Sequence, residues 1–441
     1  MQIPTEVSAW LEPRYVQIKE AIENGATIDS SLWSYLQDSE DQLIDLMNDH
    51  PPSPTAPGNI ELCWVLYFLN HKTPVWLRSA LKMIGMPSST ITADDWTKWD
   101  STLNGQGALM GDGSLVSYSQ YAVVDAGWSI AVINYFLLHL GINTKHGFGV
   151  SPATITISGQ SKLNVALFGD WGTGAYKDGN LAASPSQMIA KQVVFYQPDM
   201  AIHLGDVYYA GLSVEEKDKL LNCWPSAPKG NLTLNSNHEM YDGANGYFDT
   251  ALSNSIFNCQ QNTSYFKILF GNWIILGLDT AYYDPSSMFM EGAIVDPAQI
   301  SFLQDAGSDP TKKICILTHH NPIDTTGQNK AGLWTQVINA LGREPDYWYW
   351  GHVHNGMVYT DRSAGGNVNC RCLGNAAIPI GNASWLADSP ATVSFYTNKP
   401  LANPTIQQQL RVMNGFAILE FSNDTVLENW YYQDGSLAWH S

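Results

Sequence analysis

The sequence predicts an α/β fold: a two-sheet β-sandwich flanked by helices, preceded by a mostly helical amino-terminal domain. After Leu163, short apolar segments of strand length alternate with helical segments, which is typical of a layered α/β domain. Two further strand-like segments, 415–421 and 425–433, follow one another near the carboxyl end and indicate a second, more antiparallel sheet. A chain of 441 residues can bury two cores, so we expect a helical domain at 1–155 and the sandwich domain at 160–441.

The amino-terminal domain is predicted from the helical segments 7–25, 60–71 and 75–86. Its longest apolar run, 121–140, is nearly long enough to span a bilayer. That run contains Asp125, Asn134 and His139 and has no basic flank, so a buried core helix is favoured and no membrane span is expected. Residues 141–162 contain glycine and serine and are predicted to connect the two domains.

In the second domain, the predicted elements alternate along the chain. Short apolar runs predict strands at 163–169, 199–205, 265–271, 273–279, 313–319 and 347–351. Helices are predicted at 184–197, 296–307 and 332–342.

The charge balance limits the partners of the protein. Its 41 acidic and 22 basic residues give a net charge of −19, which argues against a broad surface for nucleic acid or anionic membranes. If the substrate is anionic, the local positive field has to come from something other than lysine and arginine, and bound metal cations would supply it.

The amino end has neither a basic region nor an apolar run of the kind found in secretory signals, so we expect a cytoplasmic protein. The six cysteines are scattered, which favours free thiols in a reducing compartment over disulfides. Cys370 and Cys372 flank one residue of an expected strand, so packing on one face is favoured over metal binding.

The glycine-rich stretch 167–174 contains the first candidate ligand. It lacks the Lys-Ser/Thr pair of a phosphate-binding loop and the spacing of the dinucleotide fingerprint. Asp170 stands where the strand 163–169 ends, and a carboxylate at the carboxyl end of such a strand is well placed to line a site.

Similar side chains follow three other predicted strands: Asp206 with Tyr208 and Tyr209, then His319 and His320, and finally His352 and His354. Asn237, His238 and Glu239 add metal-competent side chains in a polar loop. Parallel strands bring such residues together at one edge of a sheet. Carboxylate, imidazole, amide oxygen and phenolate suit ferric iron, zinc or manganese. The ligands are too many for one tetrahedral zinc, so two metals that share a carboxylate are expected.

The ordered motifs D-W-G, G-D-V-Y-Y, N-H-E, I-L-T-H and G-H-V-H, between Leu163 and Gly356, resemble the calcineurin-like metallophosphoesterase superfamily. Within it they are similar to the purple acid phosphatases. Many superfamily members have D-x-H at the first motif, whereas this chain has Asp170-Trp171-Gly172. Tyr209, three residues after Asp206, stands where purple acid phosphatases have a tyrosinate ligand.

The resemblance implies two metal ions, Fe(III) and a divalent ion (Fe, Zn or Mn). It places Fe(III) on Asp170, Tyr209 and His354. It places the divalent ion on Asn237, His319 and His352, with Asp206 as the bridge. One departure is Ser236, which replaces the glycine that usually precedes N-H-E, so the turn must tolerate a side chain.

The resemblance implies metal-dependent hydrolysis of phosphate esters by a hydroxide between the two metals, with a small phosphorylated monoester as substrate. His238 is expected to be catalytic as the proton donor to the leaving group, or else to bind phosphate or brace its loop. Asn237, His238 and His320 are expected to bind substrate. His320 either supports the ligands from outside or competes with His319 for the metal. The alternatives are a phosphodiesterase on the same scaffold and a binding or regulatory protein with a vestigial metal fold.

Overall fold

A computed structural model describes residues 5–28, 31–47, 79, 81–83, 86–110 and 113–441. The helix predicted at 60–71, most of the helix predicted at 75–86, and Cys63 lie outside the described residues.

The amino-terminal region is helical, as predicted, with a small two-stranded sheet. Its elements are α1 (Thr5–Glu23), α2 (Ser31–Met47), α5 (Ala93–Asn104), β1 (Ala108–Leu109), β2 (Leu115–Val116) and α6 (Trp128–His139). The predicted buried helix at 121–140 is shorter in the structure, because residues 121–127 form turns before α6 begins. Most of α6 is buried, and none of the described helices is both long and apolar enough to cross a membrane.

A six-stranded sheet forms one layer of the main body, in the order β16-β15-β14-β4-β5-β6. Its strands are β4 (Leu163–Phe168), β5 (Met200–His203), β6 (Gly230–Thr233), β14 (Gly415–Phe421), β15 (Val426–Tyr432) and β16 (Leu437–His440). β4, β5 and β6 are parallel, whereas β14, β15 and β16 pair antiparallel. The two predicted carboxyl-terminal strands are therefore confirmed as β14 and β15, but they extend the sheet of β4, β5 and β6 and do not form a separate sheet, because β14 pairs with β4.

An eight-stranded sheet forms the other layer, in the order β13-β11-β12-β10-β9-β8-β7-β3. Its strands are β3 (Ala153–Ile157), β7 (Phe266–Phe270), β8 (Trp273–Gly277), β9 (Lys313–Thr318), β10 (Tyr347–Trp350), β11 (Gly356–Tyr359), β12 (Asn369–Leu373) and β13 (Val393–Tyr396). β8, β9, β10 and β12 run parallel to one another, whereas β7 pairs antiparallel with β8, and β11 pairs antiparallel with β12 and β13. β3 lies inside the segment 141–162 that we expected to be a connection, and it pairs with β7.

The two sheets pack face to face. Side chains alternate along each strand between the core that lies between the sheets and the outer face that the helices cover. In β4, Val165 and Leu167 join the core between the sheets, whereas Phe168 points to the helix-covered face. In β9, Leu317 faces inward and Ile316 packs outward. This arrangement confirms the predicted two-sheet sandwich flanked by helices.

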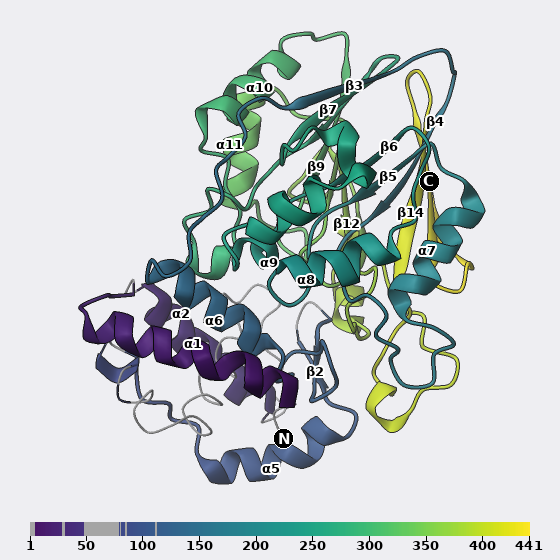
Figure 1. Cartoon of the computed structure of the whole chain (residues 1–441). Coiled ribbons are helices and arrows are strands. Elements are labelled where there is room, and N and C mark those ends of the chain that lie inside the picture. The colour runs from purple at the N-terminus through teal and green to yellow at the C-terminus, as the bar shows by residue number, and fades with distance from the viewer. Residues whose placement is uncertain (1–4, 29–30, 48–78, 80, 84–85, 111–112) are drawn as a thin grey trace.

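Helices cover both outer faces (Figure 1). They are α7 (Pro185–Tyr196), α10 (Pro297–Gly307) and α11 (Gly332–Leu341), with the short helices α8 (Ser213–Glu215) and α9 (Asn237–Met240) in loops. α7 packs on the six-stranded sheet, and α10 and α11 pack together on the eight-stranded sheet. Figure 1 shows the amino-terminal region against the end of the sandwich that carries α8 and α9.

Candidate metal centre

The predicted ligands meet at the carboxyl ends of parallel strands from both sheets. Asp170 follows β4, Asp206 follows β5, and Asn237 lies after β6. His319 follows β9, and His352 and His354 follow β10. We call this set the metal cluster: Asp170, Asp206, Asn237, His319, His352 and His354.

Asp170 and Asp206 lie at the centre of the cluster, and both are fully buried. Each has a left-handed backbone, with φ of 56° and 81°, in the tight turn that follows its strand. Glycine makes the close packing possible: a Cβ on Gly351 would lie 2.6 Å from Oδ2 of Asp170. Burial and the nearby carboxylate of Asp206 raise the pKa of Asp170 well above its usual value.

His319 shows how one half of the cluster could hold a cation. Its Nδ1 lies 2.8 Å from the carbonyl oxygen of Leu204, which can only accept, so Nδ1 carries the proton. Nε2 then presents its lone pair 3.2 Å from Oδ1 of Asp206 and 2.9 Å from Oδ1 of Asn237. Burial lowers the pKa of His319 to about 3. Three acceptor atoms thus converge without a proton between them, which suits a metal ion.

The other half of the cluster contains Asp170, His354 and a phenol. Nε2 of His354 lies 3.4 Å from Oδ1 of Asp170, and Nδ1 of His354 lies 3.4 Å from Oγ of Ser114 in the amino-terminal region. The hydroxyl of Tyr208 lies 2.9 Å from Oδ2 of Asp206, 3.3 Å from Oδ1 of Asp170 and 3.4 Å from Nε2 of His354.

The Tyr208 hydroxyl therefore lies where the resemblance to the purple acid phosphatases predicts the Tyr209 hydroxyl. The hydroxyl of Tyr209 instead hydrogen-bonds the Asp125 carboxylate, and its ring stacks on Tyr121 with the centroids 4.9 Å apart. Only the pair of adjacent tyrosines in G-D-V-Y-Y could have indicated Tyr208, because the motif does not show which of the two rings turns toward the carboxylates.

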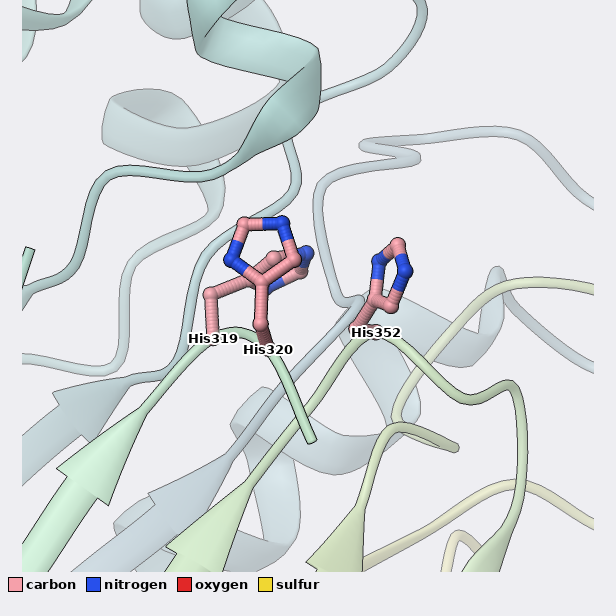
Figure 2. Close-up of side chains that lie close together, drawn as sticks. All are labelled: His319, His320 and His352. Carbon is pink, nitrogen blue, oxygen red and sulfur yellow. The ribbon is translucent and has the colours of Figure 1, made fainter. Parts of the chain in front are cut away.

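Figure 2 shows the imidazoles of His319, His320 and His352 side by side beyond the strand ends. One ring nitrogen of each lies within 4.8 Å of the others, so the group could hold an ion. Both nitrogens of His320 already have protein partners, however, with Nδ1 2.7 Å from Oγ1 of Thr280 and Nε2 2.8 Å from the carbonyl oxygen of Phe289. This geometry favours His319 as the metal ligand. His320 would then support the site from outside the ligand set.

His238 lies beside the cluster with only 5% of its surface exposed. Its Nδ1 lies 2.6 Å from the carbonyl oxygen of Tyr209 and therefore donates to it. Its Nε2 is 3.9 Å from Oδ2 of Asp206. Burial lowers the pKa of His238, and the Asp206 carboxylate opposes that shift.

Ser236 contributes a contact that sequence reasoning did not predict. Its φ of −137° is ordinary extended backbone, so the turn tolerates a side chain where the family pattern has glycine. Its Oγ lies 2.5 Å from Oδ1 of Asp206, and it also contacts the Glu239 carboxyl group and accepts from the backbone N–H of His238. Ser236 thus ties the start of α9 to the central carboxylate.

Residues 163–356 match the family model of the calcineurin-like phosphoesterases. The matched segment contains every residue of the metal cluster, and the match supports the metallophosphoesterase superfamily for this segment. No curated protein gives a significant sequence match to the chain.

Two similar solved structures have low sequence identity. GAP50, the anchor in the inner membrane complex of Plasmodium, has a TM-score of 0.40 and 12% identity, with 64% of this chain and 88% of that chain covered. A single mutant of Vps29 from Entamoeba histolytica has a TM-score of 0.25 and 13% identity, with 63% of this chain and 97% of that chain covered. Both TM-scores are too low for either similarity to carry an argument about this chain.

Proposed function

We propose that the chain is a phosphomonoesterase of the purple acid phosphatase type, which acts on a small phosphorylated substrate with Fe(III) and a divalent Fe, Zn or Mn ion. The observation that carries this proposal is the convergence of buried side chains that can bind metal around Asp206. Its Oδ1 faces Nε2 of His319 at 3.2 Å, and its Oδ2 faces the Tyr208 hydroxyl at 2.9 Å.

The donor chemistry fits two different ions that share Asp206. Asp170, His354 and a phenol suit ferric iron, because carboxylate and phenolate are hard ligands. Asn237, His319 and His352 suit a divalent ion. When bound, the two ions would supply the positive charge that holds a phosphate group and the acidity that activates water.

The residues of the chain would then orient the substrate and move a proton. Alkoxides leave poorly, so the ester oxygen of an alkyl phosphate needs a proton as its bond breaks. In its doubly protonated form His238 can deliver that proton from Nε2, because Nδ1–H donates to the Tyr209 carbonyl oxygen at 2.6 Å and thereby fixes the ring. Asn237 is held from its other side, with Nδ2 3.0 Å from the Tyr241 hydroxyl.

The test is elemental analysis of the purified full-length protein together with a panel of phosphate monoesters and diesters. We expect about two metal ions per chain, one of them iron, and faster turnover of monoesters. Asp206→Asn should lose metal and lower kcat by at least about a hundredfold, because it removes the carboxylate that both ions share. Asp305→Asn, at an exposed carboxylate on α10, is the matched control.

Each other outcome has a definite meaning. Preference for diesters would indicate the phosphodiesterase alternative. A protein with neither metal nor turnover would indicate a binding or regulatory function. If Asp206→Asn keeps both metals and full turnover, the two-metal proposal is wrong.

A further inference from the structure

The Trp128 ring at the start of α6 lies against the His238 ring, which places part of the amino-terminal region beside the metal cluster. Trp128 is the first residue of α6. Its ring centroid lies 5.2 Å from that of His238 and 5.8 Å from that of Tyr208. An aromatic side chain from outside the segment that matches the phosphoesterase family therefore packs on the expected proton donor.

The Trp128 indole is fixed in place. It is 3% exposed, and its Nε1 donates to the carbonyl oxygen of Ala122 at 2.8 Å. The turn that holds Ala122 is itself pinned by Asp125, whose carboxylate accepts from the backbone N–H groups of Tyr121 at 3.0 Å and Gly127 at 3.3 Å. A ring held in this way acts as a rigid wall.

The same turn fixes a second contact of His238. Asp125 binds the hydroxyl of Tyr209, and the carbonyl oxygen of Tyr209 accepts from Nδ1 of His238. A Cβ on Gly127 would lie 2.2 Å from the Tyr209 ring, so the glycine lets that ring seat against the turn. The turn before α6 therefore holds the His238 imidazole indirectly, through Tyr209, whereas the Trp128 ring contacts the imidazole directly.

We propose, on the basis of the proposed function, that Trp128 is a positioning residue that holds the His238 imidazole with Nε2 toward the leaving group. In the absence of the indole, the ring can tilt into the space that the indole occupied. The Tyr208 ring also packs on the indole, so the metal content of each variant is measured to separate loss of metal from loss of proton delivery. Proton delivery depends on distance and direction, so a small displacement of the donor costs rate chiefly on substrates that need the proton.

The experiment compares Trp128→Ala, Trp128→Phe and the control Trp99→Ala in the full-length, metal-loaded protein. Trp99 is also a buried tryptophan of the amino-terminal region, and its helix α5 lies at the far edge from the sheets in Figure 1. For each protein, kcat/KM is measured on an alkyl phosphate and on 4-nitrophenyl phosphate, whose leaving group departs without a proton. The rate at which diethyl pyrocarbonate modifies His238 in the metal-free protein is followed by peptide mass spectrometry.

We expect Trp128→Ala to lower the alkyl-to-nitrophenyl ratio by at least about tenfold and to speed the modification of His238. Trp128→Phe should restore most of both readouts, and Trp99→Ala should change neither. If Trp128→Ala does not fold, Trp128→Leu keeps an apolar side chain without the ring and is expected to show the same loss.

Wild-type turnover together with an unchanged ratio in the Trp128 variants would overturn the positioning role alone. A wild-type protein that binds no metal and cleaves neither ester would contradict the proposed function. In that case the modification rates still decide whether Trp128 shields His238.

Discussion

At the scale of single residues, the two adjacent tyrosines after β5 have different partners. The Tyr208 hydroxyl lies between the carboxylates of Asp206 and Asp170, whereas the Tyr209 hydroxyl binds Asp125 in the amino-terminal region. If the site holds ferric iron as proposed, its phenolate ligand would lie beside the carboxylates, and the geometry then favours Tyr208 over Tyr209 for that position. The family pattern alone points to Tyr209.

The two possibilities predict different spectra for the iron-loaded protein. Tyr208→Phe should remove the phenolate-to-iron absorption band, and Tyr209→Phe should keep it, because the phenolate oxygen is its source. Tyr209→Phe should instead destabilise the fold by about 1–2 kcal/mol, since the buried Asp125 carboxylate loses one donor. Visible spectra at matched iron content and denaturant titrations provide the measurements. Loss of the band in Tyr209→Phe alone would show that Tyr209 is the ligand.

Most residues of the metal cluster could be predicted from the sequence, because side chains that can bind metal occur directly after the ends of strands. Asp170, Asp206, Asn237, His319, His352 and His354 all come shortly after buried strands, and the parallel order of the sheets brings them together. The contacts of Tyr208 and Ser236 with the carboxylates could not be predicted, because the direction of a side chain in a tight turn depends on contacts with segments distant in the sequence. Asp125 and Tyr209 show this clearly, since 84 positions separate them in the chain.

At the scale of elements, apolar runs predicted the strands well where both faces are buried. β4, β8 and β9 coincide closely with the predicted segments. Several strands were not predicted, β11, β13 and β16 among them, and β3 and β6 show why. β3 has the alternating pattern of a half-buried strand but lies in a segment whose glycine and serine residues indicated a connection, and β6 is short and contains asparagine and glycine. β3 forms by pairing with β7, and β6 forms by pairing with β5. Such pairing between segments cannot be read from the local sequence pattern.

The loop after α9 gives a prediction at this scale. Burial raises the pKa of Asp242 to about 6, although the backbone N–H of Gly246 and the charge of Arg14 on α1 oppose the shift. The folded state therefore holds this proton more tightly than the unfolded state, whose pKa is near the ordinary 3.8. The stability contributed by that proton is present below about pH 4 and is lost as the pH rises through about 6.

Asp242→Asn removes this pH dependence while it keeps the shape of the side chain. Relative to the wild type, the variant should gain about 1–2 kcal/mol of unfolding free energy between pH 4 and pH 7. Denaturant titrations of both proteins at the two pH values measure this gain, and the other titrating groups cancel in the difference. An equal difference at both pH values would show that Asp242 does not hold the tightly bound proton.

At the scale of the whole molecule, the amino-terminal region and the sandwich share one core. Val124, Trp128 and Phe136 belong to the same buried cluster as Tyr208 and Phe289. The net charge of −19 is consistent with the proposed metals, because bound cations would supply a local positive field for a phosphate ester. The region that the sequence indicated only as helical thus completes the surroundings of the site, and composition alone could not predict that contact.

This shared core predicts what happens when the amino-terminal region is removed. A chain that begins at residue 146 keeps β3 and the metal cluster but exposes the rings that now pack against α6, including Tyr208, Tyr241 and Phe289. Each buried aromatic or aliphatic side chain contributes about 1.5–3 kcal/mol, and contiguous apolar patches of this kind favour aggregation. We therefore expect the shortened chain to aggregate or to bind a hydrophobic dye strongly in size-exclusion and fluorescence measurements. A soluble, monomeric fragment with the thermal stability of the full chain would show that the two regions are independent domains.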